Sequence, residues 1–180
     1  MKPTFLQTSR KENFSTWKFR TFLNWYPMYF GSGGKILFWD AHSREVHVRI
    51  KLNIWTYNYV GTIFGGSMFS ATDPFYMLML LRIFGNEYVV WDKSASIKFI
   101  RPARTTIYAK YLISDELIED IRADVALNNE CTRTLKLELK DANEKIYAII
   151  DRIVYVADKK HYEQKKGLTQ KAKLGKRFNS

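Results

Sequence analysis

The chain has 180 residues, of which 46% are apolar and 16% aromatic, so it can bury a substantial core and is not a disordered protein. Its formal net charge of +11 lies at the two ends, because residues 1–20 carry +4 and residues 159–180 carry +7. A nucleic-acid-binding domain would carry its charge on the folded surface. We therefore expect no nucleic-acid partner and a solvated basic tail over 159–180.

Residues that bind metals or form disulfides are scarce. Cys131 is the only cysteine, and the three histidines show no ligand spacing, so we expect neither a metal nor a cofactor. The longest apolar run, Phe75–Leu81, is far shorter than the ~20 residues of a membrane span. Residues 1–13 lack the apolar stretch of a signal peptide. These features predict a reduced, cytoplasmic protein.

Aromatic side chains are dense from Asn13 to Phe30, and their helical spacing predicts a helix that covers the core. Pro27 is expected to kink or end this helix. A helix on a membrane surface is the alternative, because Lys18 and Arg20 interleave with the aromatic residues. We treat residues 1–30 as an N-terminal helical segment, separate from the domain that follows.

The next segments change from helical to strand periodicity. Lys35–Ala41 and Glu45–Leu52 predict an antiparallel hairpin, in which the alternation of the second run puts His47 on the polar, exposed face. Residues 53–65 form a loop. Ser67–Phe84 is apolar almost all round, which predicts a buried helix.

Two pairs of strands separated by one helix complete the domain. The helix begins after Ser114, whose side chain can cap it. Antiparallel strands wrapped around one buried helix give an α+β fold over residues 31–158. The predicted strands are Val89–Arg101, Thr105–Ile113, Thr132–Leu139 and Lys145–Val156, and the helix covers 115–127.

The stretch from Asn58 to Asp73 carries the residues best suited to chemistry. Gly65 and Gly66 open the buried helix, where unpaired backbone N–H groups suit an oxyanion or a polarised carbonyl; a tight loop that needs glycine is the alternative. Asp73 lies mid-helix among apolar residues, where a charge needs a polar cavity or a partner. Pro74 follows it and is expected to bend the helix.

The pattern N-x2-G-T-x2-G-G-x6-D over residues 58–73 resembles the signature of hotdog-fold acyl-CoA thioesterases of the phenylacetyl-CoA thioesterase (PaaI) type. Residues 30–157 resemble more closely an uncharacterised hotdog family related to those enzymes. The resemblance implies a long helix wrapped by a curved antiparallel sheet over 31–158, a dimer, and an acyl-CoA site at the dimer interface.

The resemblance also implies roles for individual residues. Asp73 would act as general base or nucleophile on the thioester, the backbone N–H of Gly66 would bind the carbonyl oxygen, and Asn58 would order the site. The residue before the glycine pair is usually histidine in those enzymes, whereas here it is Phe64. Losing one such donor typically costs about 10²–10³ in rate. A non-catalytic hotdog protein that binds an acyl chain or acyl-CoA is therefore the alternative function.

Several further residues are assigned to substrate binding. Arg101 and Arg104 flank a turn and could meet the phosphates of coenzyme A, although a solvated turn is the alternative. Asp92 and Lys93 are strand neighbours and must point to opposite faces. We expect Lys93 to face inward, where it could pair with Asp73. The assigned substrate-binding set is Gly65, Phe64, Lys93, Arg101 and Arg104.

The spacing of the two central residues predicts a shared site. If the helix begins near Gly66, Asp73 lies about 10 Å further along its axis, at 1.5 Å per residue. A water held by Asp73 and a carbonyl held at Gly66 must lie ~3 Å apart. One chain cannot bring them together, whereas two antiparallel copies of the helix could. The mechanism therefore predicts a homodimer or a dimer of dimers.

Overall fold

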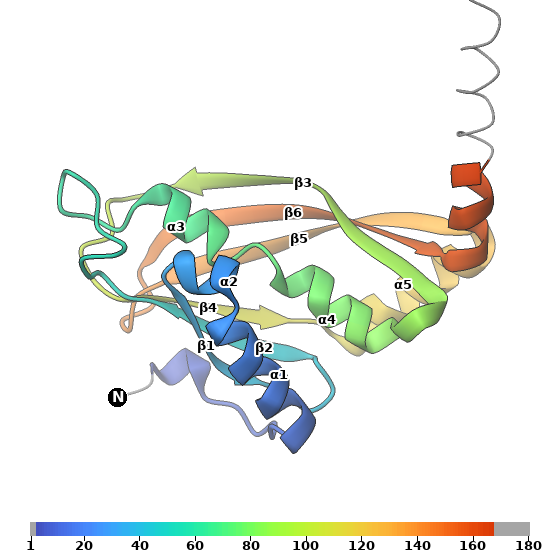
Figure 1. The fold of residues 1–180 in the computed structure, drawn as a ribbon, viewed down its shortest axis with the longest axis horizontal. Coiled ribbons are helices and arrows are strands. Elements are labelled where there is room, and N and C mark those ends of the chain that lie inside the picture. The colour runs from blue at the N-terminus through green and yellow to red at the C-terminus, as the bar shows by residue number, and fades with distance from the viewer. Residues whose placement is uncertain (1–2, 168–180) are drawn as a thin grey trace, which may run out of the picture.

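Six strands form one curved antiparallel sheet within residues 3–167, which are the residues that the computed structural model describes. The sheet wraps around the central helical segment (Figure 1). The strand order is β1-β2-β4-β5-β6-β3, so β1 and β3 form the two edges. The predicted α+β fold is confirmed. The strands are β1 (Gly34–Trp39), β2 (Glu45–Ile50), β3 (Tyr88–Phe99), β4 (Ile107–Leu112), β5 (Glu130–Lys140) and β6 (Ile146–Asp158).

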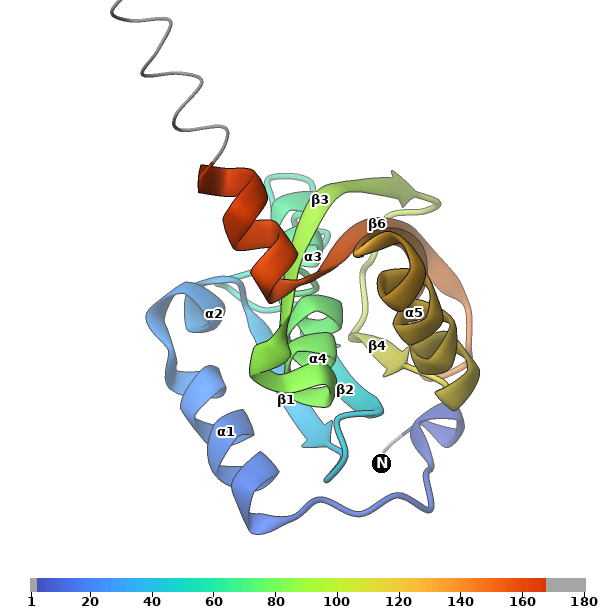
Figure 2. The same ribbon diagram turned by 90° about the vertical axis from the view of Figure 1, so that its right-hand side faces the viewer.

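The helices lie inside the curved sheet and beside it. In Figure 2 the helix α4 lies at the centre, with α1 on one side and α5 on the other. Residues 159–167 are also helical, and the remainder of the predicted tail, 168–180, lies outside the described residues. The helices are α1 (Phe14–Trp25), α2 (Pro27–Gly31), α3 (Gly65–Ser70), α4 (Phe75–Phe84) and α5 (Asp115–Asn128), with 3₁₀ turns η1 (Thr4–Leu6) and η2 (Gly85–Glu87).

Local sequence signals account for where the helices begin and end. The hydroxyl of Ser114 accepts a hydrogen bond from the Leu117 N–H at 3.2 Å, which confirms the predicted cap of α5. Asn129 ends that helix in a left-handed conformation, with φ of 64°. Pro27 ends α1, and the chain continues as the separate short helix α2.

The core lies between α4 and the concave face of the sheet. Phe75 of α4 is fully buried, and its ring packs against Trp39 and Tyr111 of the sheet and Tyr29 of α2, with centroid distances of 5.0–6.0 Å. Burying a large side chain of this kind contributes about 2–3 kcal/mol to folding. This packing fixes the central helix relative to the strands that carry the candidate site.

The N-terminal segment covers the outer face of β2, and this corrects the prediction for His47. The Thr8 hydroxyl donates to Glu45 at 2.8 Å, and the Ala41 N–H donates to the Lys11 carbonyl at 2.9 Å. His47 is fully buried, with Nε2 2.6 Å from Glu45 Oε1. The prediction that His47 is exposed was wrong because a distant part of the chain crosses the polar face of its strand.

Only part of the aromatic N-terminal helix covers the core. Phe19 and Leu23 of α1 pack against it. Tyr29 of α2 is buried in the core as well. The remaining large side chains of this region are exposed, so most of the aromatic residues that suggested a core-covering helix lie on the surface of the single chain. These exposed residues are Phe14, Trp17, Phe22, Trp25, Tyr26, Met28 and Phe30.

Candidate functional site

The central helix breaks between α3 and α4, and Asp73 lies in this break. The proline after it has no N–H, so the bend expected there is confirmed. Two buried tyrosine hydroxyls donate hydrogen bonds to backbone carbonyls in the break. Tyr29 donates to the Ala71 carbonyl at 3.5 Å, and Tyr111 donates to the Thr72 carbonyl at 3.1 Å. The break is therefore stabilised by groups outside the helix rather than being a frayed end.

Arg152 of β6 is the cation beside Asp73. Its Nη1 donates to Asp73 Oδ1 at 2.8 Å and to Asp92 Oδ2 at 3.0 Å. The Arg152 side chain is 2% exposed, and its guanidinium lies over the ring of Phe69 at 5.3 Å from the centroid. We call Asp73, Asp92 and Arg152 the Arg152 cluster. A single buried cation thus joins two carboxylates that are far apart in the sequence.

The two carboxylates of the cluster have different surroundings. Burial raises the pKa of Asp92 above its ordinary value; the charge and hydrogen bond of Arg152 oppose this rise, and the charge of Asp73 adds to it. The Asp73 side chain is 59% exposed in the single chain, so it is not buried among apolar residues as the sequence suggested. Asp73 is thus the more accessible of the two carboxylates that Arg152 holds.

The prediction that Lys93 faces inward and pairs with Asp73 was wrong. The pairing of β3 with β6 shifts register between Asp92 and Ser94, which disturbs the alternation at this point. Asp92 consequently faces Arg152, while Lys93 is exposed with its Nζ 5.7 Å from the centroid of the Tyr155 ring. Arg152 takes the role that the sequence gave to Lys93.

Sequence reasoning missed Arg152, although the signal is present in β6. The residues at 148, 150, 154 and 156 are Ala, Ile, Val and Val, and all are fully buried. Arg152 occupies the same phase of the strand and is 1% exposed. A lone arginine on the buried phase of a strand needs a carboxylate partner in the interior, which indicates an ion-pair site.

The glycine pair begins α3 under two aromatic rings. A Cβ on Gly65 would lie 2.7 Å from the Phe99 ring, and a Cβ on Gly66 would lie 2.3 Å from the Phe64 ring. Glycine thus lets both rings lie directly against the backbone, and a larger residue would displace them. The first N–H groups of a helix have no acceptor within that helix. Phe64 is 56% exposed, so its ring lies over the glycine pair without being locked in the core.

Asn58 stabilises its own loop. Its Oδ1 accepts hydrogen bonds from the N–H groups of Val60 at 3.2 Å and Thr62 at 3.0 Å, and its Nδ2 donates to Thr62 Oγ1 at 3.0 Å. The Asn58 side chain thus accepts hydrogen bonds from backbone N–H groups of the turn that follows it. Asn58 therefore shapes the loop that leads into α3.

Four of the predicted site residues line cavities, and they line two different ones. Asn58, Gly65 and Arg101 line a cavity of about 430 Å³. Asp73 lines a separate, mainly apolar cavity of about 500 Å³ between α2 and the central helix. Arg104 is exposed. Within one chain, the structure brings Asn58, Gly65 and Arg101 together but leaves Asp73 apart from them.

Two other properties concern residues 3–167 as a whole. In this part of the chain, no three histidine, cysteine, aspartate or glutamate side chains gather closely enough to hold a metal ion. None of the helices described there has both the length and the apolar character needed to cross a membrane.

The model of a family described as a domain of unknown function, DUF4442, matches residues 15–156, which include the whole sheet as far as Val156 and the central helix. The chain belongs to the DUF4442 family. No curated protein matches this DUF4442 chain.

Solved structures with low sequence identity share the fold of this DUF4442 protein. A protein of unknown function from Pseudomonas aeruginosa, PA5026, described as a probable thioesterase, is 16% identical with a TM-score of 0.70, over 79% of this chain and 95% of that one. The thioesterase HI1161 from Haemophilus influenzae is 12% identical with a TM-score of 0.59, over 84% and 96%. The PaaI protein from the phenylacetic acid degradation operon of E. coli is 14% identical with a TM-score of 0.53, over 77% and 90%. The chain therefore has the hotdog fold of these proteins.

Proposed function

We propose that this protein hydrolyses an acyl-CoA or a related thioester and that Asp73 activates the attacking water. The observation that carries the proposal is the position of Asp73. Its carboxylate is held by a buried arginine at a break in the central helix, and it lines an apolar cavity of about 500 Å³. A fixed, accessible carboxylate beside an apolar cavity suits general base catalysis on an acyl substrate.

Arg152 leaves one oxygen of Asp73 available for chemistry. The hydrogen bond from Arg152 engages Oδ1 and fixes the orientation of the carboxylate. Asp73 Oδ2 then accepts a proton from a water, whose oxygen attacks the thioester carbonyl carbon. The carbon–sulfur bond breaks as the tetrahedral intermediate collapses, and the proton passes to the departing thiolate. The products are a carboxylic acid and a thiol.

The carbonyl oxygen would be held by the Gly66 N–H of a second subunit. Asp73 and Gly65, the neighbour of Gly66, line separate cavities, which supports this arrangement. The edge strand β3 supports it further, since its outer edge has no neighbouring strand within residues 3–167 and it exposes Trp91 and Phe99. Long unpaired edges favour pairing with another chain. Phe99 also covers Gly65, so a partner at this edge would lie beside the glycine pair.

The alternative is a non-catalytic protein that binds an acyl chain or acyl-CoA. The observation that favours it is Phe64, whose ring lies against Gly66 where the related enzymes usually have a histidine. An aromatic ring adds apolar surface but no hydrogen-bond donor to a carbonyl oxygen. This reading keeps the apolar cavity beside Asp73 as a binding site and gives Asp73 no chemical role.

A panel of acyl-CoA substrates, short and long, aliphatic and aromatic, distinguishes the two functions. We expect the full chain to release free thiol from at least one class, detected with a thiol reagent. Binding of the same acyl-CoAs is measured in parallel by titration calorimetry. Binding without thiol release from any member of the panel would contradict hydrolysis and support the alternative.

A further inference from the structure

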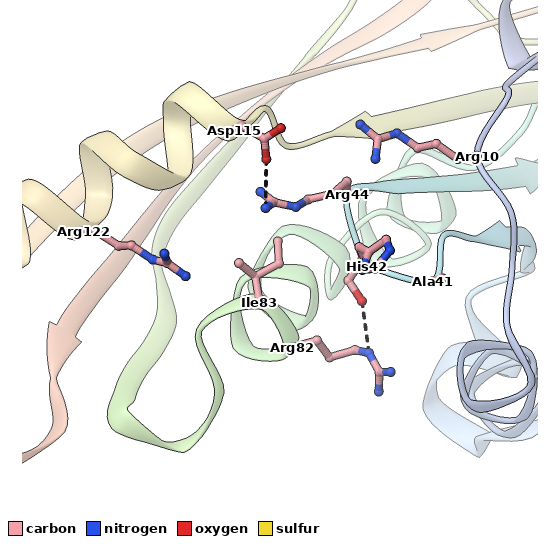
Figure 3. A pocket seen from close by; sticks show the side chains of 9 residues that line it. Arg10, Ala41, His42, Arg44, Arg82, Ile83, Asp115 and Arg122 are labelled. Atoms are coloured by element: carbon pink, nitrogen blue, oxygen red, sulfur yellow. Dashed lines mark hydrogen bonds and ion pairs between the residues drawn. The ribbon is translucent and has the colours of Figure 1, made fainter.

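Four arginines line a cavity of about 510 Å³ at the end of α4 that is remote from α3 (Figure 3). Arg10 comes from the N-terminal segment, Arg44 from the turn between β1 and β2, Arg82 from the last turn of α4, and Arg122 from α5. We call this the arginine cavity. Figure 3 shows Arg10 and Arg122 extending from opposite sides toward the region of Arg44.

The lining of the arginine cavity has an excess of positive charge. Asp115 is the carboxylate among the lining residues, and its Oδ1 lies 2.9 Å from Arg44 Nη2. Its side chain is 79% exposed, so this ion pair is largely solvated at one end. Arg10 lies 3.6 Å from Asp40 and 3.5 Å from Glu45, which are outside the lining. The guanidinium groups therefore outnumber the carboxylates that face the cavity.

Several donors of these arginines are not used within residues 3–167. Arg44 Nη1 is buried and has no hydrogen-bond partner there. Arg82 makes one side-chain hydrogen bond in this part of the chain, from Nε to Ser43 Oγ at 3.1 Å, so its two terminal amino groups remain unused. The Arg82 residue is exposed, so its amino groups are free to meet a ligand from solution. For the buried Arg44 Nη1, in contrast, lacking an acceptor is costly. An anion in the cavity would satisfy these groups.

The arginine cavity is built on a rigid turn. Ser43 is 2% exposed and has a φ of 58°, a left-handed conformation that costs a non-glycine residue about 1 kcal/mol. Its hydroxyl accepts from Trp39 Nε1 at 3.0 Å as well as from Arg82. The Arg82 guanidinium also lies 4.8 Å from the centroid of the Phe19 ring. Arg82 is thus held in place by two independent contacts.

We propose that the arginine cavity binds the phosphate groups of a small phosphorylated molecule. Guanidinium groups match phosphate oxygens with paired donors, and several of them fit the double charge of a phosphate ester or a pyrophosphate better than a single carboxylate. A concave wall of one charge also attracts such anions from solution. The volume of about 510 Å³ accommodates a ligand larger than inorganic phosphate alone. This inference does not depend on hydrolysis at Asp73.

Titration of the full chain with inorganic pyrophosphate tests the proposal. We expect saturable binding that weakens with salt, and an affinity about tenfold lower in both Arg82→Gln and Arg122→Gln, since each removes a charged donor. The Arg122 side chain is 50% exposed, so its variant should fold even if Arg82→Gln does not. Lys145→Gln removes one exposed charge elsewhere and should bind as the wild type does. Absence of saturable binding, or equal affinities in all variants, would overturn the proposal.

A parallel titration with coenzyme A identifies the source of the phosphate. If both arginine variants lower the affinities for coenzyme A and for pyrophosphate by the same factor, the cavity holds the phosphates of coenzyme A. If only the affinity for pyrophosphate falls, the cavity binds a separate phosphorylated ligand. Either result supports a phosphate site in the arginine cavity.

Discussion

Asp73→Asn is expected to lower kcat for thioester hydrolysis by about 10²–10⁴-fold while the protein stays folded. The amide keeps the size of the carboxylate and can still accept the hydrogen bond from Arg152, but it cannot take a proton from water. Because the Asp73 side chain is 59% exposed, its replacement leaves no cavity in the core. The measurement is kcat on the best acyl-CoA, with the melting temperature of each protein beside it.

Asp151→Asn is the matched control for this substitution, since it removes a carboxylate from the residue next to Arg152 on the same strand. It should leave kcat within about twofold of the wild type, because successive residues of a strand face opposite sides. Unchanged turnover in Asp73→Asn would show that Asp73 is not the base. A collapsed melting temperature together with a wild type that hydrolyses no acyl-CoA would make Asp73 a structural residue.

Arg152→Met should cause the largest loss of stability among single changes at the candidate site. It leaves Asp92 partly buried without a cation, and breaking a buried ion pair from one side typically costs 3–5 kcal/mol. Asp92 is 21% exposed, so we expect the lower end of that range, about 3 kcal/mol, in urea unfolding at neutral pH. Arg152→Met/Asp92→Asn should recover part of this loss, because the remaining carboxylate of the cluster is solvated.

The pH dependence gives a second test of the same cluster. Burial raises the pKa of Asp92, so the folded protein binds its proton more tightly than the unfolded chain does. Stability therefore falls as pH rises from the ordinary value near 4 through the raised value. Without Arg152 the rise in the pKa of Asp92 is larger. The loss of unfolding free energy in Arg152→Met, relative to the wild type, should therefore be smaller in acid, where Asp92 is protonated. A stability loss in Arg152→Met that is independent of pH would contradict this explanation.

The order of the elements could be predicted from periodicity because each strand and helix shows its own apolar pattern. Ser67–Phe84 was apolar enough to indicate the central helix, and the proline after Asp73 indicated its bend. The register shift beside Lys93 has no comparable signal in the sequence, since it depends on how β3 pairs with β6. The burial of His47 depends on a segment that lies more than thirty residues earlier in the chain.

The sequence could predict those parts of the candidate site that depend on a residue type at a fixed spacing. It could not predict which residues distant in the chain form ion pairs there. Gly65 and Gly66 leave room for the Phe99 and Phe64 rings to lie against the backbone, and the glycine pair is directly visible in the sequence. The partner of Asp73 lies 79 positions away on β6. An interior arginine in a strand signals that some carboxylate pairs with it, but the fold alone decides which one.

The central claim is that Asp73 of one subunit acts on a thioester held at Gly66 of the other. It is tested most directly by mixing Asp73→Asn subunits with Gly66→Val subunits after unfolding and refolding them together. Gly66→Val places a branched side chain next to the N–H that would bind the carbonyl and displaces the Phe64 ring, so this variant should lose that contact. With each variant inactive alone, a shared site predicts that an equal mixture regains about a quarter of the wild-type rate, because half of the dimers are mixed and each of these has one intact site. A mixture as inactive as the two separate variants would contradict the shared site.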